Sequence, residues 1–129
     1  MCLYTDGASS GNPGPSGIGV LLRFKNHEKE ISKYIGNATN NIAELKAIEA
    51  GLSILTNNEI PVIIFTDSSY ALGILVRGWK ASKNVSLVER IREKVSEFKK
   101  IKFIKVKGHD GMLENERADY LATSAIKNR

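Results

Sequence analysis

The sequence lacks the means for an internal disulfide and shows no sign of a membrane anchor. Its 129 residues include one cysteine, Cys2, which has no cysteine partner within the chain. We find neither a basic segment followed by an apolar leader nor an apolar run long enough to cross a bilayer. The single cysteine and two histidines also argue against a zinc site built from these residue types. We therefore expect a cytoplasmic protein with no membrane partner.

The composition is typical of one globular domain. The chain is 42% hydrophobic and 26% charged, and at 129 residues it can bury a core without disulfides or a structural metal. Internal repeats, low-complexity tracts and interdomain linkers are absent from the sequence, so we expect a single domain over residues 1–129, and a monomer. The net charge of +5 favours a polyanionic partner without requiring one.

Three strands are expected in the first third of the chain. Cys2–Thr5 is a short strand, and the turn residues after it place Asp6 where that strand ends. Residues 17–24 carry a dense apolar run, typical of a strand buried on both faces. Glu28 to Ile35 mixes isoleucine with charged residues, as an edge strand does. The short connections predict an antiparallel meander.

Helices and two further strands alternate in the rest of the chain. Strands are expected at Val62–Thr66, whose unbroken apolar run indicates a buried parallel strand, and at Phe103–Val106. Helices are expected from about Ile42 to before Asn57, over Tyr70 to Val76, from Ser86, which begins a Ser-x-x-Glu capping-box spacing, and after the loop Lys107–Met112. This order predicts an α/β fold with a mixed five-stranded sheet, three strands antiparallel and then two parallel, flanked by helices.

Carboxylates from four parts of the chain are predicted to meet at one edge of that sheet. The right-handed crossover rule makes the strand before Asp67 parallel to the strand before Asp6, so both residues reach the same edge. The helix that carries Glu44 begins at this edge. Asp119 lies within roughly two turns of the start of the last helix, which also begins there.

Each of these residues also has a purely structural explanation. Asp6 could begin a turn and Glu44 could complete a capping box with Asn41, whereas Asp67 could cap the next helix and Asp119 could be a solvated helix residue. Several carboxylates close together, however, cost stability unless a cation is present. Magnesium prefers hard oxygen ligands and leaves coordination positions for phosphate oxygens, so it is the cation that these residue types favour.

Five motifs extend over nearly the whole chain. They are Tyr4–Gly7 with Gly11–Pro15, Thr39–Glu44, Thr66–Ser68, Val106–His109 and Asn115–Asp119. Together and in this order they resemble type 1 ribonuclease H. The resemblance implies a ribonuclease H-like fold and a metal-dependent endonuclease that cuts the RNA strand of RNA–DNA hybrids, leaving 5′-phosphate and 3′-hydroxyl ends. It also implies that Asp6, Glu44, Asp67 and Asp119 are the metal-binding and catalytic carboxylates for two magnesium ions ~3.5–4 Å apart, which manganese can replace.

The same resemblance assigns residues around this centre. His109 resembles a mobile histidine that assists protonation or product departure, although a solvent-exposed loop histidine is the structural alternative. Glu114 resembles a carboxylate of the same loop that helps to handle metal or product. Expected substrate contacts are Asn12, Asn40 and Asn41 in the minor groove, Thr39 at a DNA-strand phosphate, and Trp79 along the DNA sugars, with a partly buried helix-end tryptophan as the alternative for Trp79.

The sequence departs from the family pattern in two places. Only residues 80–85 separate Trp79 from the next helix, where well-known bacterial members carry an insertion rich in Lys and Trp, and Ser69 replaces a glutamine that many members direct at the minor groove.

Two other functions stay open. A binding module without hydrolysis would gain nothing from carboxylates beside phosphates. A nuclease acting on double-stranded RNA is less favoured by the run Thr39–Asn41, which suits the hybrid.

Overall fold

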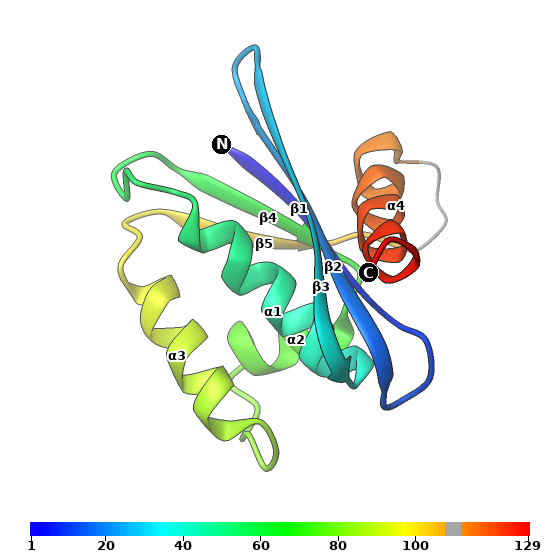
Figure 1. Cartoon of the computed structure of the whole chain (residues 1–129). Coiled ribbons are helices and arrows are strands. Elements are labelled where there is room, and N and C mark those ends of the chain that lie inside the picture. Colours follow the sequence, from blue (N-terminus) through cyan, green and yellow to red (C-terminus); the bar gives the residue numbers. More distant parts are fainter. Residues whose placement is uncertain (108–111) are drawn as a thin grey trace.

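The computed structural model describes residues 1–107 and 112–129, which form one five-stranded sheet with helices on both faces (Figure 1). The elements are β1 (Cys2–Ser9), β2 (Gly14–Phe24), β3 (His27–Ala38), α1 (Asn40–Ser53), β4 (Val62–Thr66), α2 (Ser69–Leu75), α3 (Val85–Ser96), β5 (Ile101–Lys105) and α4 (Leu113–Lys127). The sheet order is β3-β2-β1-β4-β5. The first three strands pair antiparallel, and β4 pairs parallel with both β1 and β5. The predicted mixed sheet is confirmed.

The two faces of the sheet carry different layers. Helices α1, α2 and α3 lie on one face and α4 lies on the other (Figure 1). Alternation along β1 explains the division, since Leu3 belongs to the large core beneath α1 and α3, whereas Tyr4 packs with Leu21 and Ala118 beneath α4. Within the described ranges, no helix is both long enough and apolar enough to span a bilayer.

Strand β1 is longer than predicted, and Asp6 lies within it. The antiparallel ladder with β2 pairs Asp6 with Gly19 and continues as far as Ser9 and Ser16, so the Asp-Gly dipeptide does not begin a turn. The parallel ladder with β4 ends earlier, at the pair Tyr4 and Phe65. The prediction that β1 ends before Asp6 is therefore wrong. Asp6 nevertheless lies just beyond the last parallel pair of β1 and β4, at the same end of these strands as Asp67.

Helices α1 and α3 both begin slightly earlier than predicted, α1 at Asn40 and not at about Ile42. Thr39 is the N-cap of α1, and its hydroxyl accepts a hydrogen bond from the backbone N–H of Ile42 at 3.2 Å, as its residue type favours. The capping box at Ser86 is wrong, because α3 begins at Val85 and Asn84 is its N-cap, in the left-handed conformation. Packing explains the earlier start, since Leu87 and Val88 in the first turn are buried in the core.

Candidate active site

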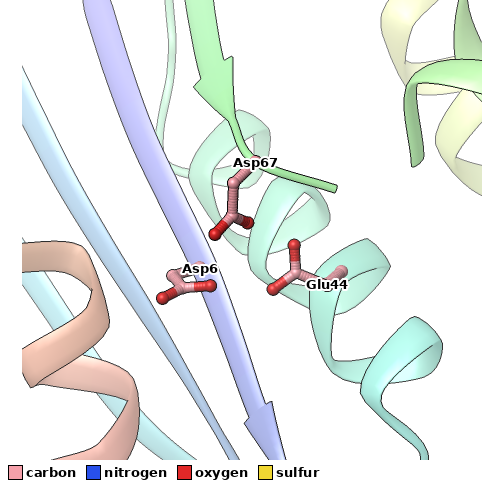
Figure 2. A group of neighbouring side chains, drawn as sticks. All are labelled: Asp6, Glu44 and Asp67. Atoms are coloured by element: carbon pink, nitrogen blue, oxygen red, sulfur yellow. The ribbon is translucent and has the colours of Figure 1, made fainter. Parts of the chain in front are cut away.

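Three carboxylates from three elements converge beside β1 (Figure 2). Asp6 projects from β1, Glu44 from α1, and Asp67 follows the end of β4. One carboxylate oxygen of each lies within 4.8 Å of the other two. Asp119 of α4 is exposed and lies outside this tight group, but it lines the same pocket of about 500 Å³. The four carboxylates, which were predicted to meet at one edge of the sheet, thus line a single pocket.

Gly7 allows α1 to approach β1 closely enough to deliver Glu44. A Cβ atom on Gly7 would lie 2.3 Å from the carbonyl carbon of Ala43, so no side chain fits there. The Gly7 backbone N–H donates to Glu44 Oε1 at 2.5 Å and to Asp6 Oδ1 at 3.0 Å. Two carboxylates are thus oriented by one peptide group.

The structural alternatives for Glu44 and Asp67 do not describe this arrangement. Glu44 faces Gly7, and the cap of α1 is Thr39, so Glu44 does not complete a capping box with Asn41. The residue that caps α2 is Ser68, whose hydroxyl accepts from the Ala71 N–H at 3.0 Å. Both carboxylates are left available for a ligand in the pocket.

The environment of the cluster raises the pKa of its two most buried members. Burial, together with the neighbouring Glu44 and Asp67 carboxylates, raises the pKa of Asp6 to about 10. Burial also raises the pKa of Glu44 to about 7, against the opposing hydrogen bonds from Asp6 and from the Gly7 N–H. Such a cluster retains protons near neutral pH, and a divalent cation would displace them. The closely spaced oxygen donors therefore fit a hard divalent metal ion.

Of the predicted substrate contacts, Asn40 and Asn41 line the pocket with the carboxylates. Asn12 lies at their side, because its Oδ1 accepts a hydrogen bond from the Asn40 backbone N–H at 2.9 Å. This bond fixes the turn after β1 to the start of α1. Thr39 adjoins the same helix start as the cap of α1.

Trp79 lies in a separate groove that adjoins the pocket. The groove, of about 150 Å³, includes Lys80 and Lys83 and shares Asn41 and Tyr70 with the carboxylate pocket. The indole of Trp79 packs over Gly73, where a Cβ atom would lie 2.1 Å from Trp79 Cε3. Trp79 is 48% exposed. Half of this aromatic surface therefore remains available to a ligand.

The first turns of α4 contribute two pocket residues that belong to the Asn115–Asp119 motif but were assigned no role from the sequence. Asn115 and Glu116 line the pocket, and Asn115 Oδ1 is buried without a hydrogen-bond partner among the described residues. The helical spacing of Asn115 and Asp119, one turn apart, is the sequence signal that could have found Asn115. Tyr70 and Lys107 also line the pocket. Lys107 lies in the Val106–His109 motif, where it was assigned no role, and Tyr70 lies outside the five motifs.

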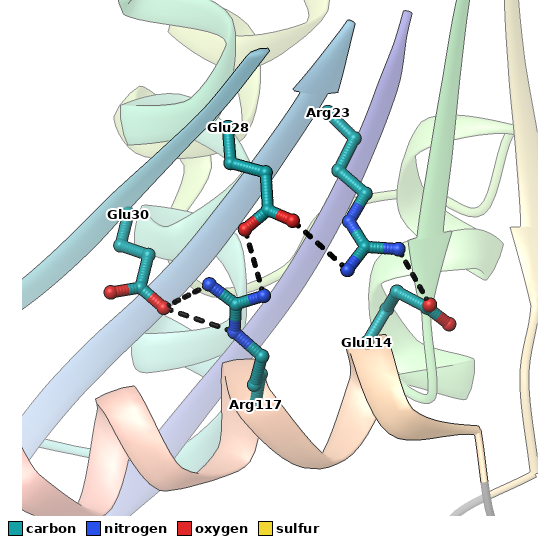
Figure 3. Close-up of polar contacts among 5 residues, drawn as sticks. All are labelled: Arg23, Glu28, Glu30, Glu114 and Arg117. Carbon is teal, nitrogen blue, oxygen red and sulfur yellow. Dashed lines mark hydrogen bonds and ion pairs between the residues drawn. The ribbon is translucent and has the colours of Figure 1, made fainter. Parts of the chain in front are cut away.

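The role expected for Glu114 is not supported. Its carboxylate accepts a hydrogen bond from Arg23 Nη1 at 2.8 Å, and Glu114 is not among the residues that line the pocket (Figure 3). The helix rotates by about 100° per residue, so Glu114 points toward β2 while Asn115 and Glu116 face the pocket. Ser69 does line the pocket, and its hydroxyl accepts from Lys105 Nζ at 2.6 Å. His109 lies outside the described residues.

A mixed sheet in this strand order, with clustered carboxylates where its two central parallel strands separate, defines a metal-dependent nuclease of the ribonuclease H-like fold. The RNase H family model matches residues 1–127, and the chain belongs to that family. The resemblance seen in the motifs is confirmed, and the protein is a ribonuclease H, a metal-dependent endoribonuclease.

The chain is similar to relatives along most of their length. It is 42% identical to the ribonuclease H of Desulforamulus reducens over 98% of this chain and 87% of the relative. It is 46% identical to the ribonuclease H of Saccharopolyspora erythraea, over 93% of this chain and 86% of the relative. The structure of RNase H1 from the archaeon Halobacterium salinarum NRC-1 matches with a TM-score of 0.84 at 30% identity, covering 99% of this chain and 98% of that one. The structure of LC11-RNase H1 in complex with an RNA/DNA hybrid matches with a TM-score of 0.81 at 28% identity, covering 98% of this chain and 96% of that one.

Proposed function

We propose that this chain hydrolyses the RNA strand of RNA–DNA hybrids at the pocket lined by Asp6, Glu44, Asp67 and Asp119, leaving 5′-phosphate and 3′-hydroxyl ends. The observation that carries the proposal is the cluster of three carboxylate oxygens within 4.8 Å of one another, on a fold that belongs to this family. The hybrid seen with LC11-RNase H1 supports the choice of substrate.

The four carboxylates would hold two divalent ions, magnesium or in its place manganese. Such ions, when bound, activate a water molecule on one side of the phosphate and stabilise the leaving oxygen on the other. Asp6, Glu44 and Asp67 would supply the closely spaced oxygen ligands, and Asp119 would add a fourth carboxylate from the other side of the pocket. The Gly7 N–H keeps Glu44 turned toward Asp6. His109 would supply a proton to the leaving oxygen or assist product departure.

The asparagines beside the pocket would recognise the minor groove of the hybrid. An amide side chain can donate to and accept from base edges and ribose 2′-hydroxyls, and the 2′-hydroxyl separates RNA from DNA. Because Asn12 Oδ1 is used by the Asn40 N–H, its amino group is the part left for the substrate. Asn40 and Asn41 line the pocket directly.

The DNA strand would follow the surface from Thr39 toward Trp79. Thr39 would hold a phosphate, and the half-exposed Trp79 would pack along the sugars. Lys80 and Lys83 line the groove of Trp79, and their charges suit the phosphates of that strand. The net charge of +5 is consistent with a polyanionic substrate.

The decisive experiment compares matched RNA–DNA, RNA–RNA and DNA–DNA duplexes, each labelled on one strand, with magnesium or manganese and in chelator. We expect cleavage of only the RNA strand of the hybrid, only with metal, and products whose 3′-hydroxyl can be extended by a polymerase. Asp67→Asn serves as the inactive control. Binding without cleavage would instead identify a binding module, and cleavage of RNA–RNA at an equal rate would identify a double-stranded RNA nuclease.

A further inference from the structure

Helix α4 lies directly on the backbone of β2 at two glycines. A Cβ on Gly19 would lie 2.1 Å from the Ala118 carbonyl oxygen and 2.6 Å from the Ala122 nitrogen. A Cβ on Gly17 would lie 2.4 Å from the Ala122 carbonyl oxygen. All three distances are far below van der Waals contact with backbone atoms, which cannot move aside as a side chain can. The separation between α4 and the sheet is therefore set by the lack of side chains at these positions.

Gly19 lies opposite Asp6 in the antiparallel ladder of β1 and β2. Residues directly opposite in such a ladder project to the same face, so the space left by Gly19 adjoins the Asp6 carboxylate. Ala118, which occupies that space, immediately precedes Asp119 in α4. The depth at which Ala118 rests on Gly19 consequently determines how far the Asp119 carboxylate reaches toward Asp6.

A second contact fixes the rotation of α4 about its own axis (Figure 3). Arg117 pairs with two carboxylates of the edge strand β3, Glu28 at 2.8 Å and Glu30 at 2.5 Å. One turn earlier, Glu114 pairs with Arg23 of β2 at 2.8 Å. Exposed ion pairs of this kind add little stability. Their geometry matters more, because they hold one side of α4 against β2 and β3 while Asn115 and Asp119 face the pocket.

We infer that Gly19 and Arg117 are positioning residues for Asp119, Gly19 setting the distance of α4 from the sheet and Arg117 setting the rotation of the helix. Gly7 positions Glu44 in the same way on the opposite face of the sheet, because its lack of a side chain lets α1 approach β1 closely. Strands β1 and β2 thus carry one glycine for each of the two helices that deliver carboxylates. The inference rests on the proposed metal-binding role of Asp119.

The first test is Gly19→Ala, with Gly17→Ala as the matched control. The added methyl in Gly19→Ala moves Ala118 outward, and a misplacement of about 1 Å can cost on the order of 100-fold in rate, so we expect kcat to fall by about 10- to 100-fold. KM for the hybrid should stay within about twofold, since Asn12, Asn40 and Asn41 are not moved. Gly17→Ala meets a similar clash further along α4, so it should lower the melting temperature comparably but reduce kcat less.

Variants of Asp119 separate positioning from general damage. In an Asp119→Asn background, Gly19→Ala should cause no further loss of kcat, because the group that it displaces is already disabled. Asp119→Glu adds one methylene to the side chain, so it should partly restore kcat in Gly19→Ala while lowering kcat in the wild type. An equal fractional loss from Gly19→Ala in the wild-type and Asp119→Asn backgrounds would overturn the inference.

Arg117→Gln provides a variant that is expected to fold even if Gly19→Ala does not, because Arg117 is on the surface. We expect a loss of kcat of several-fold in Arg117→Gln that vanishes in the Asp119→Asn background. Arg117→Lys, which keeps the charge but not the two-pronged contact, should recover part of it. A loss that persists unchanged in Asp119→Asn would contradict the positioning role of Arg117.

Binding of magnesium alone, followed by backbone amide shifts in NMR spectra, gives a readout that is independent of cleavage. In the wild type the shifts should include both Asp6 and Asp119. In either positioning variant the response of Asp119 should shrink while that of Asp6 persists, and an unchanged response at Asp119 would refute the inference. If the wild-type protein bound magnesium at these residues but cleaved no hybrid, the proposed function would be contradicted. The comparison of magnesium binding between wild type and variants would still test the positioning roles of Gly19 and Arg117.

Discussion

The backbone N–H of Gly7 donates a hydrogen bond to Glu44 Oε1 at 2.5 Å, and the same N–H donates to Asp6 Oδ1 at 3.0 Å. One peptide group of the sheet therefore sets the relative orientation of two carboxylates that come from different layers. This bond exists only because Gly7 lets the backbone of α1 approach β1 so closely. The geometry of the acidic cluster is thus a consequence of how α1 packs on the sheet.

Gly7→Ala should lower both stability and activity. The new Cβ would lie 2.3 Å from the carbonyl carbon of Ala43, and overpacking of this kind costs about 1–3 kcal/mol, more where backbone must shift. Urea denaturation measures the loss. Gly51→Ala is the control, because the atoms nearest its Cβ would be side-chain atoms of Leu3 and Val20 at 3.3–3.4 Å, so its loss of stability should be much smaller than that of Gly7→Ala. A Gly7→Ala protein as stable as the wild type would show that α1 can move away without cost.

The sheet order and the meeting of the carboxylates could be predicted because they follow from general rules. Buried strands such as Val62–Thr66 have recognisable apolar runs, and the handedness of the crossover then determines on which edge Asp67 lies. The rules act on whole elements, and they do not require the position of any one side chain. The family motifs added the identity of the metal-binding residues.

Details that depend on packing between elements could not be predicted. Asp-Gly favours a turn locally, yet Asp6 remains in β1 because β2 offers partners as far as Ser16. The Ser86 spacing favours a cap, but burial of Leu87 and Val88 starts α3 earlier. Glu114 was expected to help handle metal or product because it resembles a carboxylate of the family's loop. Its direction depends on the phase of α4, which the contacts with β2 and β3 determine.

Asp67→Asn should abolish hybrid cleavage while leaving the fold and hybrid binding intact. The amide keeps the shape of the side chain but loses the charge needed to hold the metal ions. Cleavage of a labelled hybrid, circular dichroism and a binding titration in calcium or chelator provide the three measurements. Glu59→Gln is the control, since Glu59 is exposed, pairs with Lys99 and does not line the pocket. Near-normal turnover by Asp67→Asn would contradict its role as a metal ligand.

His109→Ala should slow turnover without abolishing it. A positioned proton-transfer group typically contributes about 100- to 10,000-fold, and water can partly replace it. Steady-state kinetics should show the loss in kcat with little change in hybrid affinity. His27→Ala is the matched control, because His27 is exposed at the hairpin between β2 and β3, and its removal should not change kcat. Much weaker hybrid binding at unchanged kcat would make His109 a substrate contact instead.

The metal-free protein should become less stable as the pH rises through the neutral range. Burial raises the pKa of Asp6 from 3.8 to about 10 and that of Glu44 from 4.5 to about 7, so the folded state binds more protons than the unfolded state between those limits. The free energy of unfolding therefore falls with rising pH, from about pH 4 upward for Asp6 and between about pH 4.5 and 7 for Glu44. Melting temperatures in chelator across this range provide the measurement.

Asp6→Asn removes the larger part of this pH dependence and should raise the melting temperature in chelator at neutral pH. For a domain of this size each kcal/mol of relief corresponds to about 3–6 °C. Because a protonated Asp6 resembles the amide, the melting temperatures of variant and wild type should converge below about pH 4. Saturating magnesium should reverse the order, since an ion at a hundredfold excess over its Kd stabilises the wild type by ~2.7 kcal/mol and stabilises the variant less. If Asp6→Asn instead melted below the wild type in chelator at neutral pH, the hydrogen bond from the Gly7 N–H to Asp6 would outweigh the cost of the buried charge.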